Sequence, residues 1–248
     1  MLKKVIALNL DDLYIIWGIP IGIFLLTHLI TAGVLAFFHA DSSLMISGAL
    51  LPVCSAIVMT IVTVAHIGFS FFQALRFGQT RHRALGQAMG LIAFEASCSL
   101  ILTVLLTAVE KWLAPRFWLL LSGYQAFEWG IDGIIVPDPA LGASPVSETV
   151  SALLIEDFTL NWWWFPLLIL GGILIGIIIS TITSRFGSRG GWALWGTWML
   201  MCFGPQLFGT RAILVGDFLI WTGIVVCISG LAALIWSFYY LLHAPVKQ

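Results

Sequence analysis

Long apolar stretches separated by short polar turns dominate the pattern along the chain. Continuous apolarity over more than about 18 residues indicates a membrane-spanning helix, whereas a membrane β-barrel would alternate apolar and polar positions in segments of about ten. The stretches and the turn residues between them predict six helices, at 13–38, 44–75, 84–112, 162–183, 192–208 and 212–242. The predicted fold class is therefore an all-α integral membrane protein with six transmembrane helices.

The turns between these helices give a predicted domain plan. It consists of a cytoplasmic lead-in at 1–12, helices one to three at 13–112 with a cytoplasmic turn at 76–83, an extracellular segment at 113–161, helices four to six at 162–242 and a cytoplasmic tail at 243–248. Within the extracellular segment, we expect residues 115–136 to lie along the membrane surface as an amphipathic piece. Ser144-Pro145 suits the start of a helix, which predicts a short helix over 145–158.

Positive charge favours an orientation with both termini inside the cell. Cytoplasmic loops of membrane proteins carry an excess of Lys and Arg. With the N-terminus inside, the inner turns hold eight such residues and the outer turns hold three. The inner set is Lys3, Lys4, Arg76, Arg81, Arg83, Arg185, Arg189 and Lys247, and the outer set is Lys111, Arg116 and Arg211. The tryptophans gather near the predicted boundaries, as an aromatic belt requires.

Composition supports membrane insertion and excludes several other classes of protein. Hydrophobic residues make up 60% of the 248-residue chain, charged residues make up 9%, and the mean hydropathy is +1.03. The net charge of −1 comes without a basic stripe, which argues against a nucleic-acid partner. The four cysteines lie inside apolar stretches without CxxC spacing, and we interpret them as small apolar side chains. We expect no metal site, and we expect His28 to be a satisfied buried histidine.

Small residues and tryptophans suggest two packing features around the fourth helix. The stretch "GILIG", which ends at Gly176, has the GxxxG spacing that lets two membrane helices approach closely. The sequence "NWWWFP" is typical of an anchor at the membrane surface, with substrate stacking as the alternative.

Two ionisable residues are predicted to face each other inside the membrane. His66 lies about ten residues before the turn at 76–83 and Glu95 a similar distance after it, so each is roughly 15 Å deep at ~1.5 Å per residue. Ionisable groups at such depth are costly and usually functional. Three interpretations stay open: a structural pair that locks the two helices, a site for a cationic substrate, and a proton-coupling pair.

The turn itself concentrates scarce positive charge. In "ALRFGQTRHRALGQ", Arg76, Arg81 and Arg83 fall within eight residues of one another. Topology alone explains positive charge in a cytoplasmic turn. The arrangement also predicts a helical hairpin whose tip offers arginines and the apolar Phe77, which are favoured anchors at protein interfaces.

The phrase "RFGQTRHR", after a long second helix and before a third, resembles the membrane subunits of ABC exporters of the second permease type. Small Gram-positive exporters of the bacteriocin-immunity and peptide-toxin kind are similar. The resemblance implies that this turn contacts an ATPase subunit, through the residues Arg76, Phe77, Gly78, Gln79, Thr80, Arg81, His82 and Arg83. The chain departs from that family between helices five and six, where "GTRAILVGD" is short and leaves little room for re-entrant helices.

The resemblance implies a non-catalytic permease subunit in a bacterial plasma membrane. The chain lacks the GxxxxGK[ST] turn that holds nucleotide phosphates, so ATP and Mg²⁺ would bind a separate ABC ATPase, and a second permease copy or a sister permease would complete the pathway. Amphipathic peptides, toxins or hydrophobic drugs are the expected cargo. The alternatives are a proton-driven or facilitative transporter without an ATPase, and a membrane-embedded enzyme or assembly factor.

Overall fold

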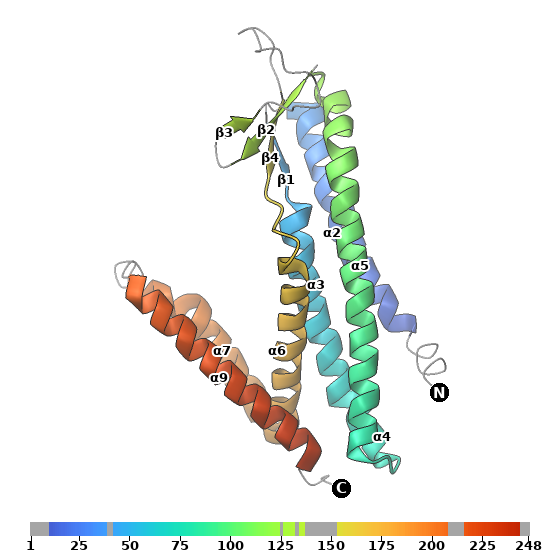
Figure 1. The fold of residues 1–248 in the computed structure, drawn as a ribbon, viewed down its shortest axis with the longest axis vertical. Coiled ribbons are helices and arrows are strands. Elements are labelled where there is room, and N and C mark those ends of the chain that lie inside the picture. Colours follow the sequence, from blue (N-terminus) through green and yellow to red (C-terminus); the bar gives the residue numbers. More distant parts are fainter. Residues whose placement is uncertain are drawn as a thin grey trace. The chain divides into compact units, whose positions relative to one another are not determined.

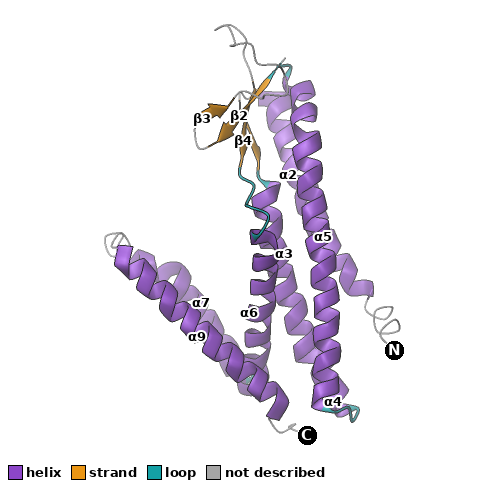
Figure 2. Cartoon of the chain, viewed as in Figure 1, coloured by secondary structure: helices purple, strands orange, loops and turns teal. Residues whose placement is uncertain are grey.

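A computed structural model of the chain is mostly helical (Figures 1 and 2). It describes residues 10–38, 42–124, 126–131, 134–136, 153–207 and 216–243. Within these residues four helical stretches are long and apolar enough to cross a membrane: Leu13–Phe38, Ser47–Arg76, Arg81–Ser122 and Trp164–Phe186. The predicted helical character is confirmed, and these stretches, which correspond to the first four predicted helices, are compatible with a multi-pass membrane protein.

The remaining helices also fall where the apolar pattern places them. Helix α7 covers Ser188–Leu207 and α9 covers Gly216–His243, which match the fifth and sixth predicted helices. Among the described residues, the apolar part of α9 is the 17-residue stretch Cys227–His243, and neither helix meets the length and hydropathy of the other four. The count of six spans and the orientation of the termini therefore stay predictions.

The second span changes helical geometry before it reaches the turn. It consists of α3 (Ser47–Ala65), a π-helical segment at His66–Phe71 and α4 (Phe72–Arg76). A π-segment inserts one extra residue per turn and is frequent at functional sites. Its first residue, His66, is buried. The predicted start of this span at Leu44 is wrong, because residues 42–45 form a strand.

Helix α5, at Arg81–Ser122, is 42 residues long. At 1.5 Å per residue it extends about 63 Å, roughly twice the ~30 Å hydrocarbon core of a bilayer. The predicted end at residue 112 is wrong by ten residues. Pro115 and Arg116 interrupt the apolar run after Trp112, yet the helix continues because Ala114 and Trp118 are buried against other elements.

A small sheet occupies part of the segment in which the sequence predicted an amphipathic piece and a short helix. Its strands are β1 (Ser42–Met45), β2 (Phe127–Ile131), β3 (Ile134–Val136) and β4 (Leu153–Asp157), in the order β1-β4-β2-β3. β4 pairs in parallel with β1 and β2, while β2 and β3 are antiparallel. The predicted helix at 145–158 is therefore wrong where it is described, because residues 153–157 form β4, and residues 145–152 lie outside the described residues. The position of residues 115–136 along the membrane surface stays a prediction.

The chain divides into two compact units. The first, which we call the outer unit, combines Met1–Val58 with Glu95–Leu170, and the second, the inner unit, combines Met59–Phe94 with Gly171–Gln248. The two names follow the predicted orientation. In the outer unit, alternate residues of β1 and β4 point inward. With residues of α2 (Leu10–Phe38) and α5 they form one apolar cluster, which contains Leu35, Met45, Ala114, Trp118, Leu153 and Ile155. The sheet thus lies against the C-terminal ends of α2 and α5 (Figure 1).

In the inner unit, α6 (Trp164–Phe186) packs closely on the second span. The hydroxyl of Thr60 donates to the carbonyl oxygen of Gly172 at 3.0 Å. A Cβ placed on Gly176 would lie 2.7 Å from Cβ of Thr63 and 2.8 Å from the carbonyl oxygen of Thr60. The predicted GxxxG contact is therefore confirmed as a contact between two helices of one chain.

Gly176→Ala is expected to weaken this contact, because a methyl group there must displace backbone as well as side-chain atoms. Overpacking of this kind typically costs about 1–3 kcal/mol. The matched control is Gly171→Ala in the same helix, where nothing lies within 4 Å of the added Cβ. Thermal unfolding of the purified full chain in lipid nanodiscs measures the difference. Equal melting temperatures for the two variants would contradict the proposed contact.

Candidate functional site

A stripe of buried polar side chains runs along α5 inside the outer unit. It consists of Glu95, Ser99, Thr103, Thr107 and Glu110, and we call it the α5 polar stripe. Each of these residues is at most 6% exposed. Their spacing of four, four, four and three residues places them on one helix face over about 22 Å. A polar face is unexpected on such an apolar helix, because each buried polar group needs a partner.

Part of the stripe is satisfied by hydroxyl contacts with α3. The hydroxyls of Ser55 and Thr103 lie 2.9 Å apart. Thr103 and Thr107 also reach the carbonyl oxygens of Ser99 and Thr103, one turn earlier, at 2.8 and 2.9 Å. Such hydroxyl contacts between membrane helices typically contribute about 0.6 kcal/mol. The middle of the stripe is therefore a polar seam between α3 and α5.

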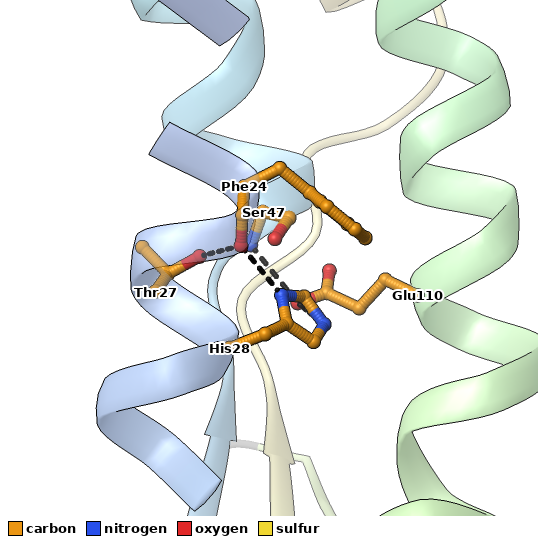
Figure 3. A network of polar contacts seen from close by, with 5 residues as sticks. All are labelled: Phe24, Thr27, His28, Ser47 and Glu110. Carbon is orange, nitrogen blue, oxygen red and sulfur yellow. Dashed lines mark hydrogen bonds and ion pairs between the residues drawn. The ribbon is translucent and has the colours of Figure 1, made fainter. Parts of the chain in front are cut away.

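The end of the stripe at Glu110 meets His28 of α2 and the first residue of α3 (Figure 3). The carboxylate oxygen Oε1 of Glu110 lies 3.7 Å from Nε2 of His28. The same oxygen accepts the backbone N–H of Ser47 at 3.4 Å. Nδ1 of His28 lies 2.9 Å from the carbonyl oxygen of Phe24, which also accepts the hydroxyl of Thr27 at 2.9 Å. Three helices thus meet at one carboxylate.

The position of Glu110 is explained by the start of α3. The first amides of a helix have no partner within the helix, and its N-terminus carries a partial positive charge that favours an anion. Ser47 is the first residue of α3, so Glu110 lies at that N-terminus. The carboxylate is only 2% exposed, and its second oxygen, Oε2, has no hydrogen-bond partner among the described residues. Hydrogen bonds from the described residues therefore solvate an ionised Glu110 only in part.

A second charged pair fixes the base of the sheet close by. Nζ of Lys111 lies 3.2 Å from Oδ2 of Asp157, while Oδ1 accepts the N–H of Thr159 at 2.8 Å. Partial burial acts to raise the pKa of the Asp157 carboxyl. The hydrogen bonds from Thr159 and the charge of Lys111 outweigh burial, and this pKa lies below its ordinary value. Thr159 in turn packs directly on Gly48, where any side chain would collide with it.

An open cavity of about 400 Å³ lies between α5 and the chain that leads from β4 into α6. It is lined by Val104, Thr107, Ala108, Lys111, Thr159, Leu160, Asn161, Trp162 and Phe165. Apolar side chains make up most of the wall, and Lys111 and Asn161 add polar groups. The shape and chemistry suit a small amphipathic molecule. Trp162 is 80% exposed beside it, and Trp163 and Trp164 stack on each other.

The turn at 76–83 forms the tip of a helical hairpin, as predicted. Gly78 has a φ of +80°, and the amides of Gly78 and Gln79 bond to the carbonyl oxygens of Leu75 and Ala74 at 3.0 and 3.1 Å. These two bonds are the Schellman motif that ends many helices, and they require the left-handed conformation that glycine adopts freely. The amide of Ala84 bonds to the carbonyl oxygen of Thr80 at 2.9 Å as α5 begins. The tip is therefore fixed by its own backbone.

Side chains at the tip divide into an exposed group and one that contacts another helix. Arg76, Phe77, Thr80, His82 and Arg83 are exposed, with Phe77 at 77%. Arg81 is half-buried, and its guanidinium donates to the carbonyl oxygen of Leu241 near the C-terminal end of α9 at 3.0 Å. Sequence analysis did not predict this contact, because it joins residues 160 positions apart.

The same end of α9 is held by a second arginine. The guanidinium of Arg185, in the last turn of α6, lies over the rings of Phe186, Trp236 and Tyr240 at 5.0 to 5.6 Å from their centroids. Cation–π contacts of this kind contribute about 0.5–2 kcal/mol each. Arginines from α5 and α6 therefore both contact α9 in the inner unit.

His66 and Glu95 are both buried, as expected for ionisable residues inside the membrane. His66 belongs to the inner unit and Glu95 to the outer unit. Their pairing, and the choice between structural, substrate-binding and proton-coupling roles, stay predictions. Glu95 is the first residue of the α5 polar stripe, which gives it a set of neighbours that the prediction did not include.

Sequence analysis missed Glu110 and treated His28 as an isolated histidine. The signal that was present is the regular spacing of polar residues within the apolar stretch from Glu95 to Glu110. The hairpin of β2 and β3 was also signalled, because Asp132-Gly133 between them is typical of two-residue hairpin turns. Among the residues that the structure describes, no group of three or more His, Cys, Asp or Glu side chains could hold a metal ion.

The Asp157 carboxylate is expected to make the stability of the sheet depend on pH in the acidic range. The pKa of this carboxyl is lowered in the folded chain. Its contribution to the free energy of unfolding is therefore complete above the ordinary pKa of about 3.9 and is lost as the pH falls through the lowered pKa. Melting of the full chain in nanodiscs, followed by tryptophan fluorescence at about pH 5 and about pH 3, should show this loss. The Asp157→Asn variant should melt at a lower temperature than the wild type at about pH 5, and its melting temperature should fall less between about pH 5 and about pH 3. The neighbouring control Glu156→Gln should show the same fall as the wild type. An unchanged loss in Asp157→Asn would contradict the assignment.

Comparison with models of protein families, with curated proteins and with solved structures finds no match to this chain. The resemblance of the turn at 76–83 to exporters of the second permease type therefore remains a prediction from sequence.

Proposed function

We propose that the chain is the membrane-spanning permease subunit of an ATP-driven exporter in a bacterial plasma membrane, with six transmembrane helices and both termini inside. The observation that carries the proposal is the hairpin tip. It presents an exposed phenylalanine and exposed basic side chains on a backbone held by a Schellman motif. A fixed surface of this kind loses little conformational entropy when it docks, which favours its use as an anchor for a soluble partner.

The contacts of Arg81 support a mechanical role for the tip. A partner that moves the tip moves the start of α5, and the bond from Arg81 to Leu241 passes the displacement to the end of α9. α5 also continues without a break to the polar stripe. The same displacement is therefore delivered to the buried residues Glu95 and Glu110, which are the polar groups that a transport pathway requires.

The partners follow from this arrangement. An ABC ATPase binds ATP and Mg²⁺ and docks at the tip, and a second copy of the chain or a sister permease completes the pathway. The cavity beside Lys111 and Trp162, with its apolar wall and polar groups, supports an amphipathic cargo such as a peptide, a toxin or a hydrophobic drug. In this proposal the chain itself catalyses no reaction.

A second candidate function is a proton-driven transporter without an ATPase. It is favoured by the buried carboxylates at the two ends of the α5 polar stripe and by the histidine beside Glu110. Carboxylate and histidine chains inside membrane helices are typical of proton relays. The two candidates differ in whether the hairpin tip has a binding partner.

The orientation is tested by two cysteines placed at opposite ends of α5. In a background without the four native cysteines, we expect His82→Cys to react with a membrane-impermeant maleimide only after cell lysis. Leu120→Cys, which replaces a side chain 83% exposed near the other end of the helix, should react in intact cells. Labelling of His82→Cys in intact cells would rule out a cytoplasmic tip and with it the ATPase contact.

The docking role is tested by a pair of phenylalanines. Phe77→Ala should lower co-purification of the full chain with the proposed ABC ATPase subunit by about tenfold or more, as expected for an interface anchor worth about 1.4 kcal/mol or more. The matched control is Phe69→Ala in the same span, since the Phe69 side chain is 75% exposed but lies eight residues before the tip. Equal ATPase recovery with both variants would contradict docking at the tip.

A further inference from the structure

We propose that His28 and Glu110 together form a binding site for one exchangeable proton in the outer unit. The two side chains come from α2 and α5 and meet at the first residue of α3 (Figure 3). The inference rests on the geometry of these residues alone. It holds whether the energy for transport comes from ATP or from a proton gradient.

The first step concerns the tautomer of His28. Its Nδ1 lies 2.9 Å from the carbonyl oxygen of Phe24, and a carbonyl oxygen only accepts hydrogen bonds. Nδ1 must therefore carry a hydrogen in this arrangement. In the neutral imidazole, Nε2 then presents a lone pair. This nitrogen is the one that faces Glu110, with Oε1 at 3.7 Å.

The second step concerns Glu110. Its Oε1 accepts the amide hydrogen of Ser47, and its Oε2 has no hydrogen-bond partner among the described residues. An ionised Glu110 beside a neutral His28 would place a buried negative charge against a lone pair. Burying an incompletely paired carboxylate is costly. Hydrogen bonding from Ser47 offsets part of this cost, and one proton, on Nε2 as an imidazolium or on the carboxyl group, removes the remainder.

The third step is the charge around the pair. Asp157 of β4 acts electrostatically on Glu110, and its carboxylate pairs at 3.2 Å with Lys111, the residue after Glu110 on α5. The remaining positive contribution is the N-terminus of α3, which carries only about half an elementary charge. One bound proton brings the His28–Glu110 pair to neutrality, whereas no proton leaves it at −1 and two protons leave it at +1.

Exchange with water requires the packing around the pair to open. The His28 side chain is 22% exposed, but its Nε2 is buried, and Glu110 is 2% exposed. A proton that enters the opened site binds Nε2 of His28. It then moves from Nε2 to Oε1 of Glu110, which converts an ion pair into two neutral groups without any other bond being made or broken. Release reverses these steps, and histidine is suited to such exchange near neutral pH.

The test uses the full chain in lipid nanodiscs with ¹⁵N-labelled histidine. Nitrogen NMR follows protonation of His28, and infrared difference spectra between pH steps follow the carboxyl group of Glu110. In the wild type we expect the two signals to change together, because coupled groups titrate as a pair. Glu110→Gln should remove the carboxyl signal and lower the proton affinity of the site by about tenfold or more. Glu156→Gln, a change in β4, should leave both signals as they are.

His28→Gln supplies a second variant in case Glu110→Gln does not fold. It should change the pH at which the Glu110 carboxyl signal appears, and Glu110→Asp should restore part of the coupling. A His28 midpoint that is the same in the wild type and in Glu110→Gln would overturn the proposal. Signals that respond to added Na⁺ at fixed pH would also overturn it, because the site would then bind a metal cation instead of a proton.

Discussion

The cost of burying charge among apolar helices is the constraint on which the rest of this structure depends. Glu110 is nearly inaccessible, and a carboxylate in such a place needs donors that the surrounding helices supply. The structure meets that need by beginning α3 beside it, so that a helix N-terminus and a histidine both face the same group. The start of α3 and the packing of α2 on α5 are therefore linked through one side chain.

Helix α5 carries most of the organisation that follows from this constraint. One end begins at the hairpin tip, where a Schellman motif fixes the turn and Arg81 contacts α9. Its middle bears the α5 polar stripe, and its far end packs against the sheet through Trp118. The hairpin tip, a polar seam and the contact with the sheet thus lie on one continuous helix. The permease role that we propose would use this continuity to link the tip to buried polar groups.

The apolar length of a stretch and its turn residues predicted the structure correctly where that structure involves one helix or one turn. Apolar length predicted the first and fourth spans closely, and Gly78 between two apolar stretches predicted the hairpin tip. The end of α5 and the sheet were missed, because hydropathy reports only the part of a helix that faces lipid. Residues 114–122 are held in α5 by their contacts with strands that come from distant parts of the chain.

The sequence by itself determined that the chain is mostly helical, with apolar helices of membrane-spanning length and a basic hairpin tip, because hydrophobic length and turn residues act over a few neighbouring positions. Only the tertiary structure decided which polar residues meet. His28, Ser47 and Glu110 are separated by 19 and 63 positions, and no periodicity in one helix can show that they share a contact. Their meeting is set by where α3 begins relative to α2 and α5, and the pairing of β1 with β4 fixes that point.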